Sequence, residues 1–432
     1  MSRSYATDSQ DYDRRDLAER VATIIEAVRR RGDDALRELE RGARGFAPDE
    51  LRVSELHIER CFARIPQDAL DDVRFVLDEA RAFAEVQRTA IRNVEVDSHA
   101  GVRYGLRHVP LPAAGVCGAG ASGLTPPPGL TGVATAVAAG VPRIVACAAL
   151  NDGCLPALSI AALRLAGADE IYAVDGVQAV AALALGTESI ERVDVVVGSG
   201  DAAMGEANRQ LFGGRAVELD ATHHEMLIIA DETASAEIVA ADVLAVIDGD
   251  PDARAVVITA DPGLAARVAG AVEQQLDEHP SRTFAATAWE RHGAVNVVSS
   301  REEACALADR YALHHVEVLT AEPHWYLGRL RRCATVLLGH DTAPGLVNGI
   351  RAHTAGGQSV ARGSGLSVTS FLNTVAYHEC LEPETTRLAS EVFARQRRLS
   401  GLEAYARAAE LRVAEAAAAK TDDTHVELLP AG

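Results

Sequence analysis

Apolar segments of four or five residues alternate with helical segments from residue 143 to residue 200, and this alternation constrains the fold more than any other feature. The apolar segments have the length and composition of buried strands. They lie at residues 143–147, 170–174 and 193–197. The helical segments between them each end at a glycine, which is a common stop signal. Short strand–helix–strand units favour a parallel, doubly wound sheet, so the sequence predicts an α/β protein.

A second series of the same kind follows. Its apolar segments lie at residues 226–230, 255–259 and 294–298. Outside the two series the apolar residues recur at helical spacing, which predicts long helices at residues 16–39, 70–88 and 382–420. We expect Gly32 to end the first of these helices and Asp33 or Asp34 to cap the next. No repeat of fixed period is present, so a solenoid is excluded.

Composition limits the partners and the compartment. The formal net charge of −20 argues against nucleic acid or an anionic membrane as a partner, because both require basic patches. The 7 cysteines are scattered without a CxxC pair, which indicates reduced thiols and a cytoplasmic protein. The N-terminus has no apolar signal segment. The longest apolar stretch, residues 130–150, is interrupted by glycine, proline and arginine, so we expect a buried helix and strand there.

Five longer segments carry a resemblance to a known family. They are residues 30–38 (RRGDDALRE), 82–88 (AFAEVQR), 101–105 (GVRYG), 176–188 (GVQAVAALALGTE) and 365–368 (GLSV). On these segments the chain resembles the histidinol dehydrogenase family over nearly its whole length. The resemblance implies an α/β fold with two intertwined, incomplete Rossmann-like domains and helical N- and C-terminal arms, assembled as a homodimer. It also implies two NAD-dependent hydride transfers that oxidise an amino alcohol to the acid.

The resemblance also implies a division of the chain. We expect an N-terminal arm, a discontinuous first Rossmann-like domain, a second Rossmann-like domain that holds the cofactor, and a C-terminal helical arm. In that order they comprise residues 1–24, residues 25–115 with 227–370, residues 116–226, and residues 371–432.

The positions that bind zinc in the family have changed in this chain. By the resemblance they are occupied by Val246, by Gly249, by Gly345 or Leu346, and by Tyr405. The aliphatic side chains and glycine offer no nitrogen, sulfur or oxygen ligand to zinc. We therefore expect no zinc. Tyr405 would either contact the substrate, as a proton or hydrogen-bond donor, or fill the vacated volume. Asp248 keeps the acidity of its family counterpart and is expected to support a neighbour or cap a helix.

The catalytic positions retain acid–base groups. The family's glutamate–histidine pair corresponds to His314 and His315, so His315 is the expected general base. A histidine at position 314 can accept a proton near neutral pH, but it lacks the permanent charge of a carboxylate. His224 stands at the family's substrate-serine position, and His353 is a further candidate for substrate binding. A relocated metal at these histidines is the alternative, which we rank lower because adjacent strand residues point to opposite faces.

The cofactor positions are partly retained. By the resemblance Gln178 contacts NAD, Asp201 replaces an asparagine, and Cys117 replaces a tyrosine. Gly120 belongs to a glycine-rich segment whose backbone amides could approach a diphosphate. Such glycines also serve as tight turns, and Asp201 adds negative charge beside an anionic cofactor, so NAD is an uncertain ligand. Cys117 could be a nucleophile, but a small apolar filler is the more common role for such a thiol.

Three functions remain open at this point. The first is zinc-independent, NAD-dependent oxidation of a small polar alcohol or amine other than histidinol. The second is a non-redox acid–base reaction, such as an isomerisation, cyclisation or elimination, on the same scaffold. The third is a non-catalytic paralogue. The sequence specifies neither the substrate nor the pathway, nor whether Tyr405 acts in its own or the partner subunit.

Overall fold

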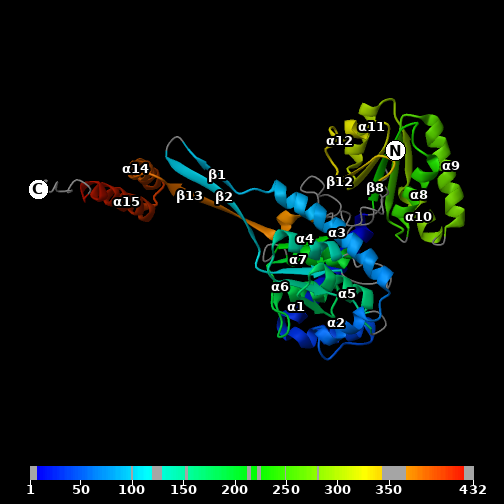
Figure 1. The fold of residues 1–432 in the computed structure, drawn as a ribbon, viewed down its shortest axis with the longest axis horizontal. Coiled ribbons are helices and arrows are strands. Elements are labelled where there is room, and N and C mark those ends of the chain that lie inside the picture. The colour runs from blue at the N-terminus through cyan, green and yellow to red at the C-terminus, as the bar shows by residue number, and fades with distance from the viewer. Residues whose placement is uncertain are drawn as a thin grey trace, which may run out of the picture. The chain divides into compact units, whose positions relative to one another are not determined.

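The computed structural model describes residues 7–98, 101–118, 129–150, 154–211, 216–220, 225–248, 250–279, 282–342 and 366–422. The chain forms two compact units. Unit 1 comprises Met1–Arg88 and Pro110–Phe371, and unit 2 comprises Thr89–Val109 and Leu372–Gly432. Within the described residues, unit 1 contains two five-stranded sheets and unit 2 a three-stranded sheet (Figure 1).

The first sheet is parallel throughout and has the strand order β5-β4-β3-β6-β7. Its strands are β3 (Ala114–Cys117), β4 (Ile144–Cys147), β5 (Glu170–Tyr172), β6 (Val195–Ser199) and β7 (Ala216–Asp220). Six helices pack in this β3–β7 domain: α1 (Thr7–Arg44), α2 (Glu55–Phe62), α4 (Leu130–Ala139), α5 (Ala157–Ala166), α6 (Gly176–Leu185) and α7 (Ala202–Leu211). The strand order reverses between β3 and β6, as in one half of a doubly wound fold.

The second sheet repeats this order as β10-β9-β8-β11-β12 and is also parallel. Its strands are β8 (Glu225–Ala230), β9 (Arg254–Thr259), β10 (Ala294–Val297), β11 (His315–Leu319) and β12 (Thr335–Leu338). The helices of this β8–β12 domain are α8 (Ala236–Ile247), α9 (Pro262–Glu278), α10 (Arg282–His292), α11 (Arg301–Tyr311) and α12 (Pro323–Leu327). Both predicted series are therefore parallel sheets, and the predicted α/β class is confirmed.

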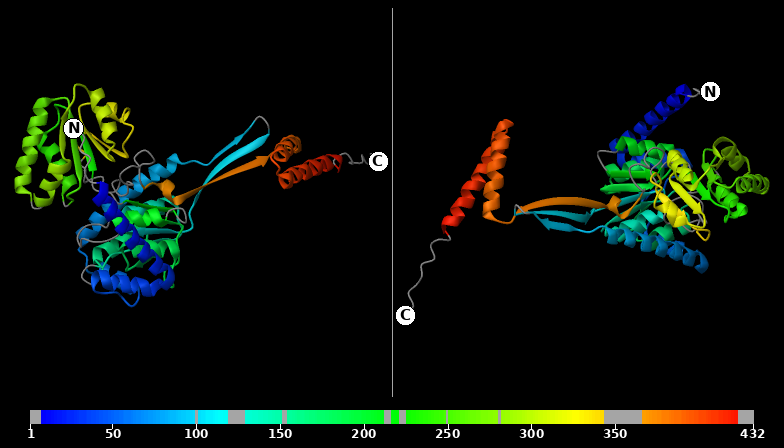
Figure 2. Two further views of the ribbon diagram at one scale, coloured as in Figure 1. Left: turned by 180° about the vertical axis from the view of Figure 1, so that it is seen from behind. Right: turned by 90° about the horizontal axis from the view of Figure 1, so that it is seen from above.

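Unit 2 is an antiparallel pair extended by a third strand and a helical hairpin. It contains β1 (Val94–Asp97), β2 (Val102–Pro110), β13 (Leu372–Cys380), α14 (Pro383–Leu399) and α15 (Glu403–Asp422), with the strand order β1-β2-β13. The two helices pack on each other through small side chains at Ala394, Ala406 and Ala409. Figure 2 shows this hairpin at the end of β13. Among the described residues, no helix is long and apolar enough to cross a membrane.

Helix α1 bends at Gly32, where the sequence predicted a helix end. Gly32 has φ of 50°, and a Cβ atom there would lie 2.0 Å from the Glu188 carboxylate. That carboxylate accepts a hydrogen bond from the Asp33 backbone N–H at 2.8 Å. The close approach of Glu188 and the positive φ both require glycine. The Asp33 carboxylate accepts a hydrogen bond from Ser189 Oγ at 3.0 Å, so it fixes the segment after α6.

The packing of the N-terminal helices differs from the predicted division of the chain. We expected residues 25–115 to belong with residues 227–370. Instead α1 packs against α6 and α7, and α2 packs against α5. The reason is that the apolar stripe of α1, including Val21 and Val28, is buried in the same hydrophobic cluster as the residues of α6. Helix α3 (Gln67–Ala90) and the 3-10 helix at Val368–Phe371 complete unit 1.

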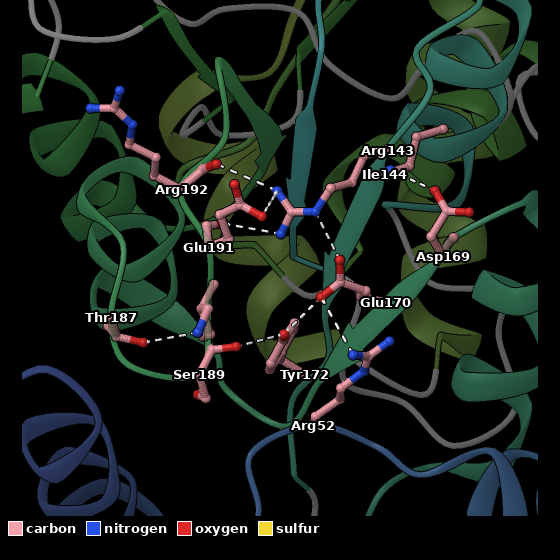
Figure 3. A network of polar contacts seen from close by, with 12 residues as sticks. Arg52, Arg143, Ile144, Asp169, Glu170, Tyr172, Thr187, Ser189, Glu191 and Arg192 are labelled. Atoms are coloured by element: carbon pink, nitrogen blue, oxygen red, sulfur yellow. Dashed lines mark hydrogen bonds and ion pairs between the residues drawn. The ribbon is translucent and has the colours of Figure 1, made fainter.

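A polar network holds the segment after α6 on the edge of the first sheet (Figure 3). Arg143 Nε donates to Glu170 Oε1 at 2.8 Å, and Tyr172 Oη lies 2.8 Å from both Glu170 Oε2 and the Ser189 carbonyl oxygen. Burial raises the pKa of Glu170, but the hydrogen bonds from Arg143 and Tyr172 outweigh it, and the pKa lies below its ordinary value. The network is structural, because its polar groups are satisfied by one another.

Candidate functional site

The most unusual group in the β8–β12 domain is a buried histidine that contacts a partly buried carboxylate. His314 precedes β11 and is 2% exposed. Its Nδ1 contacts Oε1 of Glu225, the first residue of β8, and its backbone N–H donates to the same oxygen at 3.1 Å. An ionised carboxylate only accepts hydrogen bonds, so Nδ1 of His314 carries a proton.

The electrostatics of this pair favour the ionised carboxylate. Burial raises the pKa of Glu225, but the contacts with His314 and the nearby charge of Arg254 outweigh burial, so the pKa lies below its ordinary value. Arg254 is the residue opposite Glu225 in the pairing of β8 with β9. Glu225 thus supplies a fixed negative charge beside His314.

His315 is the first residue of β11 and is partly buried. It lies opposite Met226 of β8 and Thr335 of β12, so it occupies the centre of this sheet end. Strand alternation directs His314 and His315 to opposite faces and places Glu317 on the face of His315. Glu317 is buried. The expected base therefore has a buried carboxylate on its own face of the strand.

The described residues predicted at or near the family's zinc-ligand positions lie in the β8–β12 domain and in unit 2. Val246, at a family zinc-ligand position, is 1% exposed and packs in the apolar core of the β8–β12 domain. Asp248 is exposed at the end of α8. Tyr405 is 61% exposed near the start of α15 in unit 2, with the Arg397 guanidinium 6.0 Å from its ring centre. The predicted role of Tyr405 stays a prediction.

Gln178 is bound to a buried carboxylate in the β3–β7 domain. Its Nε2 donates to Oε1 of Glu40 at 2.8 Å, and the Asp175 backbone N–H donates to the same oxygen at 3.1 Å. Glu40 is 0% exposed and also pairs with Arg44 at 3.2 Å. Arg44 in turn donates to Asp175 Oδ2 at 2.7 Å. The amide nitrogen of Gln178 therefore has a structural partner.

Cys117 and Asp201 also have structural partners. The Cys117 thiol at the end of β3 is fully buried beside Cys147, and a hydrogen bond with Cys147 together with burial raises its pKa well above the ordinary value. A buried thiol with a raised pKa is typical of a small core filler, whereas a nucleophile needs a lowered pKa, and the predicted role of Cys117 stays a prediction. Asp201 Oδ1 accepts from the N–H groups of Ala203 and Met204 at 3.0 and 3.1 Å, which caps α7.

Six predicted positions lie outside the described residues: Gly120, His224, Gly249, Gly345, Leu346 and His353. Within the described part of the chain, no cluster of three or more histidine, cysteine, aspartate or glutamate residues forms a metal site. His340 has its Nε2 atom 3.2 Å from Thr233 Oγ1.

Sequence reasoning missed two residues, Glu225 and Glu40. The signal for Glu225 was present, because it is an acidic residue that begins an otherwise apolar strand, Met226–Ala230. In the sequence, Glu40 forms only an ordinary i,i+4 pair with Arg44, a pattern that is typical of an exposed helix surface. Its burial depends on the docking of α1 on α6, which the sequence did not show.

The comparisons with known proteins agree with this geometry. The family model described as histidinol dehydrogenase matches residues 7–413. The chain belongs to the histidinol dehydrogenase family. A histidinol dehydrogenase homolog of Shouchella clausii is 35% identical over 396 residues, which cover 91% of this chain and 93% of the relative. The histidinol dehydrogenase of Geobacillus kaustophilus is 36% identical over 401 residues, covering 91% and 93%.

The fold of a solved family structure is also similar. The crystal structure of histidinol dehydrogenase from Elizabethkingia anophelis superposes with a TM-score of 0.84 and 22% identity, covering 96% of this chain and 94% of that one. The family resemblance inferred from the five segments is thus confirmed, and so is the fold that it implied.

Proposed function

We propose that this member of the histidinol dehydrogenase family is a zinc-independent, NAD-dependent dehydrogenase of a small polar alcohol or amine other than histidinol. The observation that carries the proposal is the buried His314–Glu225 pair, with His315 next to it on β11. A family member that had lost all chemistry would have no need to bury a charged carboxylate beside a histidine, because such burial costs free energy.

In this proposal His315 accepts the proton of the substrate hydroxyl or amine group, as the family position implies. Glu317 lies on the same face of β11 and stabilises the positive charge that forms on His315. Glu225 keeps Nδ1 of His314 protonated and orients its ring beside the proton-accepting His315. NAD, when bound, accepts the hydride.

Zinc does not fit the residues that are described. Val246 offers only aliphatic carbon and is packed in the core, whereas zinc requires nitrogen, sulfur or oxygen ligands. The Tyr405 hydroxyl, in the exposed helical hairpin of unit 2, is a poor replacement for a histidine ligand. We therefore derive no step through a metal, and a substrate that depends on metal coordination is disfavoured.

The strand order of the β3–β7 domain is suited to dinucleotide binding, although several of the side chains that were expected to contact NAD have other partners. The crevice outside the carboxyl ends of β3 and β6, where the strand order reverses, is the usual position for such a cofactor. Gly118, directly after β3, has φ of 78° and lets the backbone turn there. Cofactor contacts would come from this backbone and from the N-terminus of α7 beside Asp201.

A specific observation favours the second candidate, a non-redox acid–base enzyme. The amide nitrogen of Gln178 is bound to Glu40, the Cys117 thiol is buried beside Cys147, and the Asp201 carboxylate caps α7. Three of the four predicted cofactor contacts thus have other partners. The histidine pair would then move protons between substrate atoms without NAD.

Calorimetric titration of the metal-stripped protein with NAD separates the two candidates. For the dehydrogenase we expect saturable binding at micromolar strength that a chelator does not change. Replacing Asp201 with asparagine should tighten binding by about 2- to 5-fold, because a negative charge is removed while the cap of α7 is kept. Asp261→Asn is the matched control, since Asp261 caps α9 through Gly263 N–H at 2.8 Å in the other domain.

Absence of heat and of thermal shift at millimolar NAD, in both the wild type and Asp201→Asn, would exclude the dehydrogenase and leave the acid–base enzyme and the non-catalytic paralogue. An equal effect of Asp201→Asn and Asp261→Asn would show that the variant acts through general charge and not through a site at α7.

We also propose a homodimer in which unit 2 is the main contact. Its described residues expose large apolar side chains on both the strands and the helices, which is unusual for a monomer. They include Val94, Val96, Tyr104, Leu388, Leu399 and Leu411. Analytical ultracentrifugation should give about twice the chain mass of 45.6 kDa. The double variant Val96→Lys/Leu388→Lys should sediment as a monomer, whereas a monomeric wild type would refute the proposal.

A further inference from the structure

A pocket separate from the histidine pair opens in the β3–β7 domain, with a volume of about 420 Å³. It lies among the segment that follows α1, helix α2 and the start of α5, which are neighbours in Figure 1. Leu150 and Ala173, which follow β4 and β5, form its floor. The pocket lies at the carboxyl ends of β4 and β5 and not at the strand reversal between β3 and β6, where the cofactor is proposed to bind. Its volume suits a small organic molecule.

The pocket concentrates positive charge in a chain whose net charge is −20. Among the described residues that line it, Arg52, His57 and Arg64 are basic and one, Glu50, is a carboxylate. Arg52 has one distant ion pair, 4.0 Å from Glu170 Oε2. Arg64 stands beside Cys61, whose pKa is raised by burial and lowered in part by the Arg64 charge. Three basic side chains around one concavity favour a bound anion.

The N-terminal end of α5 adds further positive electrostatic potential to the pocket. Ala157 lines the pocket and is the first residue of α5. Pro156 precedes it and gives no side-chain cap, and the first turn of α5 contains no acidic residue. Neither the cap residue nor the first turn of α5 therefore supplies a carboxylate to the backbone N–H groups and the helix dipole at this end. An anionic group of a ligand would supply the missing acceptor.

The remaining wall is apolar. Phe46, Leu150 and Leu155 line it, and Phe46 exposes almost half of its surface although it is aromatic. An aromatic ring at a concave surface gains free energy when a flat apolar group covers it. The pocket thus offers an apolar wall and a cationic wall, with the Glu50 carboxylate available to a hydroxyl or amine of the ligand.

We propose that this pocket is a second ligand site, which binds a small organic anion with an aromatic or aliphatic body and one carboxylate, sulfonate or phosphate group. Arg64 and the start of α5 hold the anionic group, and Phe46 and Leu155 cover the body. The site is independent of the proposed dehydrogenase, because it shares none of its residues.

Cys154 makes the proposal testable without knowledge of the natural ligand. Cys154 is exposed and lines the pocket, whereas Cys380 is exposed in unit 2 and serves as an internal control. We would alkylate the full-length protein with N-ethylmaleimide and follow both thiols by mass spectrometry, with phenyl phosphate as the probe. Phenyl phosphate should slow the alkylation of Cys154 in a saturable manner and leave Cys380 unchanged. Uncharged benzyl alcohol should give no protection, and inorganic phosphate should protect more weakly.

Two variants at the end of α2 and just after it identify the binding group. Arg64→Gln should weaken the protection by about 10-fold, because a charge-assisted hydrogen bond is lost. Arg60→Gln makes the same change four residues earlier, within α2 and outside the pocket, and it should have no effect. Circular dichroism of both variants would confirm that they are folded.

Three results would overturn the proposal. The first is no protection of Cys154 at 10 mM phenyl phosphate, about the weakest affinity that a specific site of this size would show. The second is an equal loss in Arg60→Gln and Arg64→Gln. The third is protection by NAD with the same dependence on Arg64, which would assign the pocket to the cofactor.

Discussion

Replacing Glu225 with alanine is expected to lower the free energy of unfolding of the β8–β12 domain by about 3–5 kcal/mol. The variant leaves His314 without its carboxylate at a position that is 2% exposed, and it removes the acceptor of the His314 backbone N–H. Urea unfolding followed by tryptophan fluorescence measures this domain alone, because both tryptophans, Trp289 and Trp325, lie in it.

Glu232→Ala is the matched control. Glu232 is an exposed carboxylate in the segment after β8, and its loss should change the free energy of unfolding by less than about 1 kcal/mol. The double variant Glu225→Leu/His314→Leu should recover most of the stability, because both polar partners are removed together. A Glu225→Ala variant as stable as Glu232→Ala would show that the buried pair is energetically unimportant.

The same carboxylate gives the domain a defined pH dependence. Burial raises the pKa of Glu225, but His314 and Arg254 lower it further, so the folded-state pKa lies below the unfolded-state value near 4.5. The contribution of Glu225 is therefore complete above pH 4.5 and is lost as the pH falls through the folded-state pKa. Glu225→Gln, which keeps an acceptor but does not titrate, should show a smaller loss of stability between pH 5 and about pH 3.

Replacing Glu40 with alanine is the second large expected effect, about 3–5 kcal/mol in the β3–β7 domain. Glu40 is 0% exposed and joins α1 to the start of α6 through Gln178 and the Asp175 backbone N–H. Without it, Arg44 keeps only Asp175 as a charged partner, and the Gln178 amide loses its acceptor. Hydrogen–deuterium exchange of peptides from α6 should become faster by a factor of about 100 or more, as the opening free energy falls.

Glu38→Ala on the same helix is the control, because Glu38 is largely exposed and forms a surface ion pair with Arg31. Its loss should leave α6 exchange within a few-fold of the wild type. If Glu40→Ala also left α6 protected, then Gln178 would not depend on Glu40, and its predicted role as an NAD contact would gain support.

The order of strands and helices was readable from the sequence because buried parallel strands are apolar throughout and their helices end at glycine. The segments predicted at 226–230 and 255–259 correspond to β8 and β9 within one residue. The kink of α1 at Gly32 was also encoded locally, since only glycine fits its φ and the approach of Glu188.

The sequence did not predict which helices pack against which sheet. Helix α1 has an apolar stripe that would fit either sheet, and only the packed structure placed it on α6 and α7. The burial of the candidate cofactor residue Cys117 also depends on the packed structure. Cys117 at a strand end was compatible with a loop position, yet its thiol lies in the core beside Cys147.

The sequence by itself determined the family and the α/β class, because these depend on which residues are present and in what order. The tertiary structure alone decided which groups meet. Glu225 and His314 are 89 residues apart, and Glu40 and Gln178 are 138 residues apart. Contacts at such separations depend on sheet register and helix docking, and therefore on the burial of the whole core and not on local sequence.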